Sequence, residues 1–61
     1  MKIPFEQIEE AISRGNIGFC LTCGWVYDGI EPDATAYLCE EGCGFNTVYG
    51  AQEILMMGEV E

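Results

Sequence analysis

Apolar residues recur at helical spacing near the start of the chain, with acidic residues between them. Positions three or four apart share one face of a helix, so the pattern indicates an amphipathic element. It predicts a helix over residues 4–14, because Pro4 suits the first helical position and Gly15-Asn16 tolerates the left-handed conformation that ends helices. The predicted apolar face consists of Phe5, Ile8, Ala11 and Ile12.

Farther along, the apolar positions form short runs rich in aromatic and β-branched residues, which favour strands. These runs predict strands over residues 25–27 and 45–49, with Gly50 breaking the second strand. Residues 51–57 fit a short helix, and the tail over residues 59–61 is expected to fray. The predicted core face of this second helix consists of Ile54, Leu55 and Met57.

The chain has 61 residues, of which 49% are hydrophobic, a composition that is not typical of a disordered segment. This length allows one domain, residues 1–61. Domains below about 70–80 residues bury little apolar surface and usually need disulfides, a metal ion or a partner chain as well. The sequence should therefore contain a further source of stability.

Four cysteines, with no histidine, are the candidates for that source. They fall in two close pairs, Cys20 with Cys23 and Cys39 with Cys43. The first residues do not form the long apolar stretch of a secretory signal, so the chain is expected to be soluble and cytoplasmic. In a reducing compartment, thiols at this spacing favour a metal over disulfides. Two disulfides, or four reduced core thiols, are the alternatives.

The two halves of the cysteine region resemble each other. Residues 19–27 and 38–49 each give a strand, a cysteine turn, a glycine, an aromatic residue and a strand. Gly24 and Gly44 are expected to adopt the left-handed conformation that closes each turn. The second turn is one residue longer, and Gly42 is expected to absorb the extra residue. This alignment pairs Val26-Tyr27 with Val48-Tyr49.

Two facing turns place four sulfurs around one point, and a tetrahedral four-thiolate site suits zinc and also iron. All four coordination positions are then filled, which leaves no place on the metal for a water or a substrate. With no histidine as a base and Ser13 as the only serine, we expect no enzymatic activity. The metal would be structural, or would carry electrons if it is iron. The predicted ligands are Cys20, Cys23, Cys39 and Cys43.

The charge balance narrows the range of partners. Eleven acidic residues against two basic ones give a formal net charge of −9. Such a surface repels nucleic-acid phosphates and anionic membranes, so neither is an expected partner. It favours a basic protein partner, including a nucleic-acid-binding protein blocked by charge mimicry. The acidic residues that would form an interaction face, or would simply be solvated, are Asp28, Glu31, Asp33, Glu40 and Glu41.

Large aromatic residues flank the cysteine turns. We expect them to pack as core around the metal, since a small domain has few other large apolar side chains. A partner-binding patch is the alternative. These residues are Trp25, Tyr27, Phe45 and Tyr49.

The turns CLTCG and CEEGCG, each followed by a β-prone stretch, resemble the zinc-ribbon superfamily over residues 18–50. The runs EPDATAYLCEEGCG and VYGAQEILMMG are similar to small zinc-ribbon proteins of bacteria and their phages, which extends the resemblance to residues 18–58. This resemblance implies a zinc-binding fold and no particular activity. The run CLTCGWVYD also resembles the first half-motif of rubredoxin, which implies an iron site and electron transfer.

The sequence thus predicts a small metal-stabilised α+β domain of the zinc-ribbon kind. Its two cysteine turns sit on short antiparallel strands, between an N-terminal helix and a short C-terminal helix. The predicted function is a non-enzymatic zinc-binding module that contacts a basic protein. The alternatives are a rubredoxin-like electron carrier and a metal-free or purely structural domain of a larger assembly.

Overall fold

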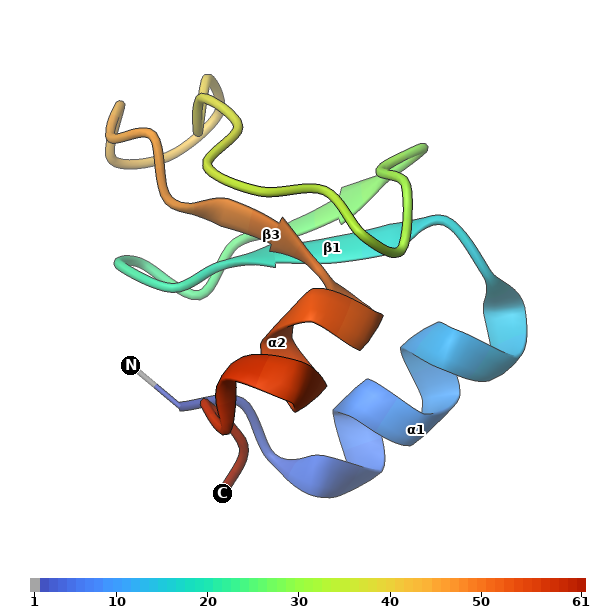
Figure 1. The fold of residues 1–61 in the computed structure, drawn as a ribbon. Helices are drawn as coiled ribbons and strands as arrows, with labels where there is room; N and C mark the ends of the chain where they lie inside the picture. The colour runs from blue at the N-terminus through green and yellow to red at the C-terminus, as the bar shows by residue number, and fades with distance from the viewer. Residues whose placement is uncertain (1) are drawn as a thin grey trace.

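The computed structural model describes residues 2–61. Within them, one helix lies near each end of the chain, and the short strands come between the two helices in the sequence (Figure 1). The elements are α1 (Phe5–Arg14), β1 (Ile17–Cys20), β2 (Val26–Asp28), β3 (Val48–Gly50) and α2 (Ala51–Met57). The strands form an antiparallel sheet in the order β2-β1-β3. The predicted α+β fold is confirmed.

Helix α1 is the amphipathic helix that the apolar spacing predicts. It begins at Phe5, and the carbonyl of Pro4 accepts the N–H of Ile8 at 3.2 Å. Ile8 and Ala11 are buried. The helix ends at Arg14 and is capped by Gly15, which has a φ of 78° and donates its N–H to the carbonyl of Ala11 at 2.9 Å. The members of the predicted apolar face that remain exposed are Phe5 and Ile12.

Strand β1 lies at the centre of the sheet, and its side chains alternate between the two faces. Phe19 lies opposite Val26 of β2 and Tyr49 of β3, and Cys20 lies opposite Val48. Phe19 packs in a core with both helices, whereas Cys20 and Val48 belong to a separate core. The helices therefore cover one face of the sheet, and the segment between β2 and β3, which carries the second cysteine turn, lies over the other (Figure 1).

Strand β3 begins three residues later than predicted and includes Gly50, which the sequence pattern places after the strand. Gly50 pairs with Gly18 of β1. A side chain on Gly50 would overlap the backbone carbonyls of Glu31 and Pro32. The strand ends at Gly50, as predicted, and α2 begins at the next residue. Glycine is needed at this position because another segment of backbone approaches closely.

The two ends of the described chain pair side by side. Ile3 forms a parallel bridge with Val60, donates its N–H to the carbonyl of Glu59 at 3.0 Å and accepts the N–H of Glu61 at 2.9 Å. The expectation that residues 59–61 fray is wrong, because their backbone is paired and Val60 packs against the core. The buried residues of this helix-side core are Ile3, Ile8, Ala11, Phe19, Ala51 and Ile54.

Helix α2 buries only one narrow stripe. Ala51 and Ile54 are buried, whereas Leu55 and Met57 are 43% and 42% exposed and Met56 is 82% exposed. The predicted core face is therefore correct at Ile54 and wrong at Leu55 and Met57. Successive helical positions are rotated by about 100°, so Leu55 turns away from the side of the helix that buries Ile54. Met57 is the last residue of the helix and is exposed there. Neither helix of residues 2–61 has the length and apolar character needed to cross a membrane.

Candidate metal centre

The first cysteine turn continues directly from the end of β1. Cys20 is the last residue of that strand, and its N–H donates to the carbonyl of Trp25 at 2.8 Å. The N–H of Gly24 donates back to the carbonyl of Cys20 at 2.9 Å. Gly24 has a φ of 80°, so the predicted left-handed closure of this turn is confirmed.

The second turn repeats these bonds although it is one residue longer. The N–H of Cys39 donates to the carbonyl of Phe45 at 2.9 Å, and the N–H of Gly44 donates to the carbonyl of Cys39 at 3.0 Å. Gly44 also has a φ of 80°. The predicted repeat of two cysteine turns is therefore confirmed at the level of the backbone.

The shared bonds change how the two halves align. Trp25 and Phe45 are equivalent, because each carbonyl accepts the N–H of the first cysteine of its own turn. Two residues farther on, Tyr27 is then equivalent to Thr47. The sequence alignment, which pairs Tyr27 with Tyr49, is wrong because it followed the similarity of side chains and not the backbone bonds.

Gly42 lies in the second, longer turn, at the point where its backbone comes close to the sulfurs. A Cβ added there would lie 2.7 Å from Sγ of Cys23 and 2.9 Å from Sγ of Cys39. Its φ is not left-handed, unlike those of Gly24 and Gly44. Gly42 absorbs the extra residue by letting the backbone pass close to two of the sulfurs.

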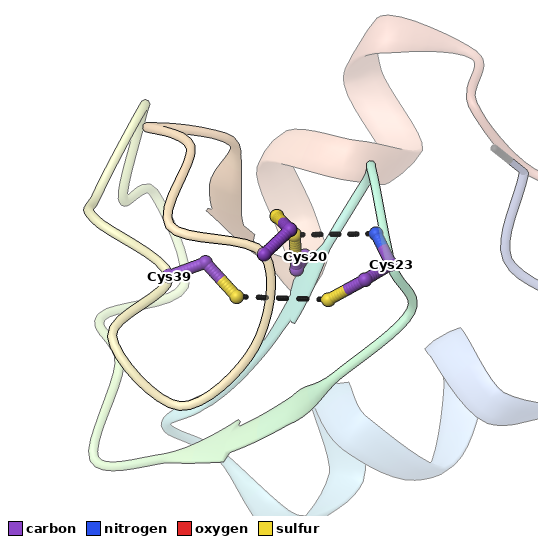
Figure 2. A group of neighbouring side chains, drawn as sticks. Cys20, Cys23 and Cys39 are labelled. Atoms are coloured by element: carbon purple, nitrogen blue, oxygen red, sulfur yellow. Dashed lines mark hydrogen bonds between the residues drawn. The ribbon is translucent and has the colours of Figure 1, made fainter.

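The four predicted ligands come together at one point. Their Sγ atoms all lie within 4.8 Å of one another. The Sγ atoms of Cys20 and Cys43 are 3.6 Å apart, and those of Cys23 and Cys39 are also 3.6 Å apart (Figure 2 shows the second pair). In a regular tetrahedron with metal–sulfur bonds of about 2.3 Å, the sulfurs are about 3.8 Å apart. The four free thiols therefore fit one four-coordinate metal ion, and no disulfide joins them.

The cluster has a buried side and an open side. Cys20 and Cys39 are fully buried, Cys43 is half-buried and Cys23 is exposed. The buried pair forms a small core with Val48 on the sheet face away from the helices. A metal ion held by these sulfurs would fasten the second cysteine turn to the sheet.

Hydrogen bonds favour the thiolate form of Cys20. Burial raises the pKa of its thiol, but hydrogen bonds from the Thr47 hydroxyl and from two backbone N–H groups bring the pKa down to about 6. The N–H groups of Thr22 and Cys23 lie 3.4 and 3.5 Å from the sulfur, as Figure 2 shows for Cys23. Thiolate is the form that binds metals, so this sulfur is prepared for a cation.

The two thiols of the second turn differ in the direction of their pKa shifts. Burial raises the pKa of Cys39, but hydrogen bonds from the Tyr27 hydroxyl and the Cys43 N–H leave it below its ordinary value. For Cys43, the N–H of Phe45 lowers the pKa, yet burial and the other three sulfurs raise it to about 11. Burial and the bond to Cys39 raise the pKa of Tyr27 to about 12. Metal ligands must be deprotonated, so a metal ion bound by these sulfurs would act against this rise in the pKa of Cys43.

The sequence pattern predicts Tyr27 only as an apolar side chain around the metal, and it does not single out Thr47. The hydrogen bonds of both residues to the sulfurs were not predicted. The Tyr27 hydroxyl donates to Sγ of Cys39 at 3.1 Å, and Oγ1 of Thr47 lies 3.2 Å from Sγ of Cys20. Both residues stand three positions after the glycine that closes their turn. Aligning the halves on that glycine, without a gap, would have found them.

The aromatic residues do not all pack around the cluster. Tyr27 packs against the buried cysteines, as expected, whereas Tyr49 packs against the helix-side core. Trp25 and Phe45 are 47% and 60% exposed. The expectation of a common aromatic core is wrong for these three, because Trp25 and Phe45 lie at the corners of the turns and Tyr49 points to the other face of the sheet.

The structure thus defines a small α+β domain with a four-cysteine cluster on a three-stranded antiparallel sheet, which is consistent with a zinc-ribbon-like metal site. Comparison with models of protein families, with curated proteins and with solved structures gives no match. The likeness to zinc ribbons and to rubredoxin therefore rests on the cysteine turns and on the strands that carry them.

Proposed function

We propose that this chain is a zinc-binding module without catalytic activity, in which Cys20, Cys23, Cys39 and Cys43 hold one ion. The observation that carries the proposal is the convergence of the four Sγ atoms within 4.8 Å of one another. Four thiolates complete the tetrahedral shell that zinc prefers in structural sites. The bound metal would then have no open position for a substrate.

The role of the metal would be to replace a missing hydrophobic core. Within residues 2–61, three fully buried residues form the core on the cysteine side of the sheet, Cys20, Cys39 and Val48, and the half-buried Tyr27, Ile30 and Cys43 pack against them. Structural zinc in small domains contributes an apparent binding free energy of about 10–16 kcal/mol, and this becomes folding free energy when the site forms only on folding. Bound zinc would therefore hold the second cysteine turn on the sheet.

One observation favours iron as the second candidate. The first turn directs the N–H groups of Thr22 and Cys23 at Sγ of Cys20, and its sequence resembles the first half-motif of rubredoxin. Hydrogen bonds to ligand sulfurs tune the reduction potential of iron–sulfur sites. The longer second turn departs from that family and favours zinc, since zinc sites accept spacings of two to four residues.

Elemental analysis of protein purified without added metal tests both candidates. One equivalent of zinc per chain supports the proposal. Iron with a reversible redox couple supports electron transfer instead. A metal-free protein that remains folded after treatment with a strong chelator contradicts both and favours the purely structural alternative.

The proposed partner is a basic protein surface in the cytoplasm, and neither nucleic acid nor a membrane. The net charge of −9 supports this choice. In the two cysteine turns and directly after them, Glu40, Glu41, Trp25 and Phe45 are exposed. Exposed aromatic residues among acidic ones are a surface on which a cationic partner gains both charge and apolar contact.

A pull-down at low and at raised salt concentration tests the partner. We expect a basic protein that is retained at low salt and released as salt screens the charges. The double variant Glu40→Lys and Glu41→Lys should lose it. The matched control, Glu6→Lys and Glu9→Lys on α1, makes the same change in net charge and should retain it. Absence of a specific partner at low salt, or equal loss in both variants, contradicts the proposal.

A further inference from the structure

Two hydroxyl groups lie against the two buried sulfurs of the cluster. Oγ1 of Thr47 is 3.2 Å from Sγ of Cys20, and the hydroxyl of Tyr27 is 3.1 Å from Sγ of Cys39. A metal-bound thiolate has no proton to donate, so both hydroxyls act as donors in the loaded site. Each buried sulfur thus accepts a charge-assisted hydrogen bond, which is stronger than a hydrogen bond between two neutral groups.

The two hydroxyls act reciprocally between the halves of the repeat. Tyr27 follows the first turn and donates to Cys39 of the second, whereas Thr47 follows the second turn and donates to Cys20 of the first. These two reciprocal hydrogen bonds connect the two turns across the place where the metal fits. It uses equivalent positions, because both residues stand three places after the glycine of their own turn.

The direction of each hydroxyl is also fixed by an equivalent contact. The oxygen of Tyr27 accepts the N–H of Glu41 at 3.0 Å, and the oxygen of Thr47 accepts the hydroxyl of Thr22 at 2.9 Å. Glu41 and Thr22 each stand two places after the first cysteine of their turn. Because each oxygen is already an acceptor, its own proton is left to point at the sulfur, and chains of hydrogen bonds of this kind reinforce one another.

The other two sulfurs lack this support. Cys23 is exposed and Cys43 is half-buried. Across residues 2–61, hydroxyl hydrogen bonds reach neither of them. The site therefore has an inner pair, Cys20 and Cys39, whose positions are fixed, and an outer pair of which Cys23 is the more accessible.

We propose that Tyr27 and Thr47 are positioning residues that fix the inner sulfurs, so that ligand exchange at this site begins at Cys23. The inference rests on the proposed metal site and adds the side from which the metal is exchanged. The incoming ligand would be a thiol or another soft chelator, since soft ligands compete for a thiolate-bound ion. Removing an outer contact of this kind costs metal sites about 10- to 100-fold in affinity.

Cobalt-loaded protein gives a readout that a merely structural role would not change. Thr47→Val and Tyr27→Phe should move the sulfur-to-cobalt charge-transfer band to longer wavelength and speed metal transfer to a chelator by roughly tenfold or more. Thr47→Ser keeps the hydroxyl and should restore both properties. Tyr49→Phe is the control, because it removes a tyrosine hydroxyl that has no hydrogen bond to a sulfur. Bands and rates equal to those of the unchanged protein overturn the inference.

Alkylation tests the order of exchange separately. Limited treatment of zinc-loaded protein with iodoacetamide, which forms a thioether and releases iodide, should modify Cys23 first, as read by mass spectrometry of peptides. First modification of Cys20 or Cys39 overturns the inference while leaving the metal site in place. If the unchanged protein binds neither zinc nor cobalt, the proposed metal site itself is wrong, and this inference falls with it.

Discussion

Substitution of Gly42 by alanine tests the metal centre most directly. The Cβ added by Gly42→Ala would lie 2.7 Å from Sγ of Cys23 and 2.9 Å from Sγ of Cys39. The φ of Gly42 is not left-handed, so alanine introduces no backbone strain of that kind. The effect of the substitution is therefore confined to its collision with two ligand sulfurs.

The size of the effect follows from the distances. Moving the Cys23 sulfur from 2.7 Å to ordinary contact at 3.4 Å requires a shift of about 0.7 Å. Metal–ligand distances vary by only about 0.2 Å in good sites, so a shift this large breaks or distorts a metal–sulfur bond. We expect at least the 10- to 100-fold loss of affinity seen for weaker disturbances, or about 1.4–2.8 kcal/mol.

Competition with a chromophoric chelator measures this loss, and the cobalt charge-transfer band reports how many sulfurs remain bound. Gly29→Ala is the matched control, because Gly29 has a φ of 80° and its added Cβ meets nothing within 4 Å. Alanine there costs about 1–2 kcal/mol of left-handed strain without touching a sulfur. It should lower stability and leave the cobalt band unchanged.

The result that refutes this reasoning is a Gly42→Ala protein with the affinity and cobalt band of the unchanged protein. A band that weakens equally in Gly42→Ala and Gly29→Ala also refutes it. In that case the loss would come from destabilised folding and not from contact with the sulfurs.

Three further predictions concern the whole fold. A strong chelator should remove the dispersed NMR spectrum of the metal-loaded chain, since the cysteine-side core is small; a spectrum that survives contradicts metal-dependent folding. Ala36→Gly should raise the free energy of unfolding by up to about 1 kcal/mol, and with it the thermal midpoint, because Ala36 has a φ of 56° that favours glycine. An unchanged or lower midpoint argues against this. Hydrogen bonds from its own backbone N–H and from the Tyr37 hydroxyl, the latter at 2.8 Å, lower the pKa of Glu31. The stability that Glu31 contributes is therefore present above its unfolded pKa and is lost as pH falls through the lower folded pKa. In a series of unfolding measurements at decreasing pH, Glu31→Gln should weaken the loss of stability in acid more than Glu9→Gln does. Parallel curves for the two variants would show that the Glu31 contact contributes nothing.

Local signals in the sequence were sufficient for the helices and the turns. The spacing of Ile8 and Ala11 predicts the buried face of α1, and the glycines at 24 and 44 adopt the predicted left-handed closures. The gathering of the four cysteines also follows from two facing turns. These features depend on contacts within a few residues, or on a cysteine pattern with few alternative geometries.

Side-chain direction could not be read in the same way. Strands of three or four residues give too little alternation to fix register, and a shift of one residue exchanges the two faces of a sheet. This is why Tyr49 points to the helices and Trp25 to solvent, against expectation. The role of Gly50 was equally hidden, because the backbone carbonyls that exclude a side chain there come from a distant segment.

By itself, the sequence determined the two helices, the two cysteine turns and the four cysteines of the candidate metal site. Only the tertiary structure decided which sulfurs are buried, which hydroxyls reach them and which side of the cluster is open. The physical reason is that Tyr27 and Thr47 each contact the opposite turn, so their role exists only once β1 has brought the two halves together.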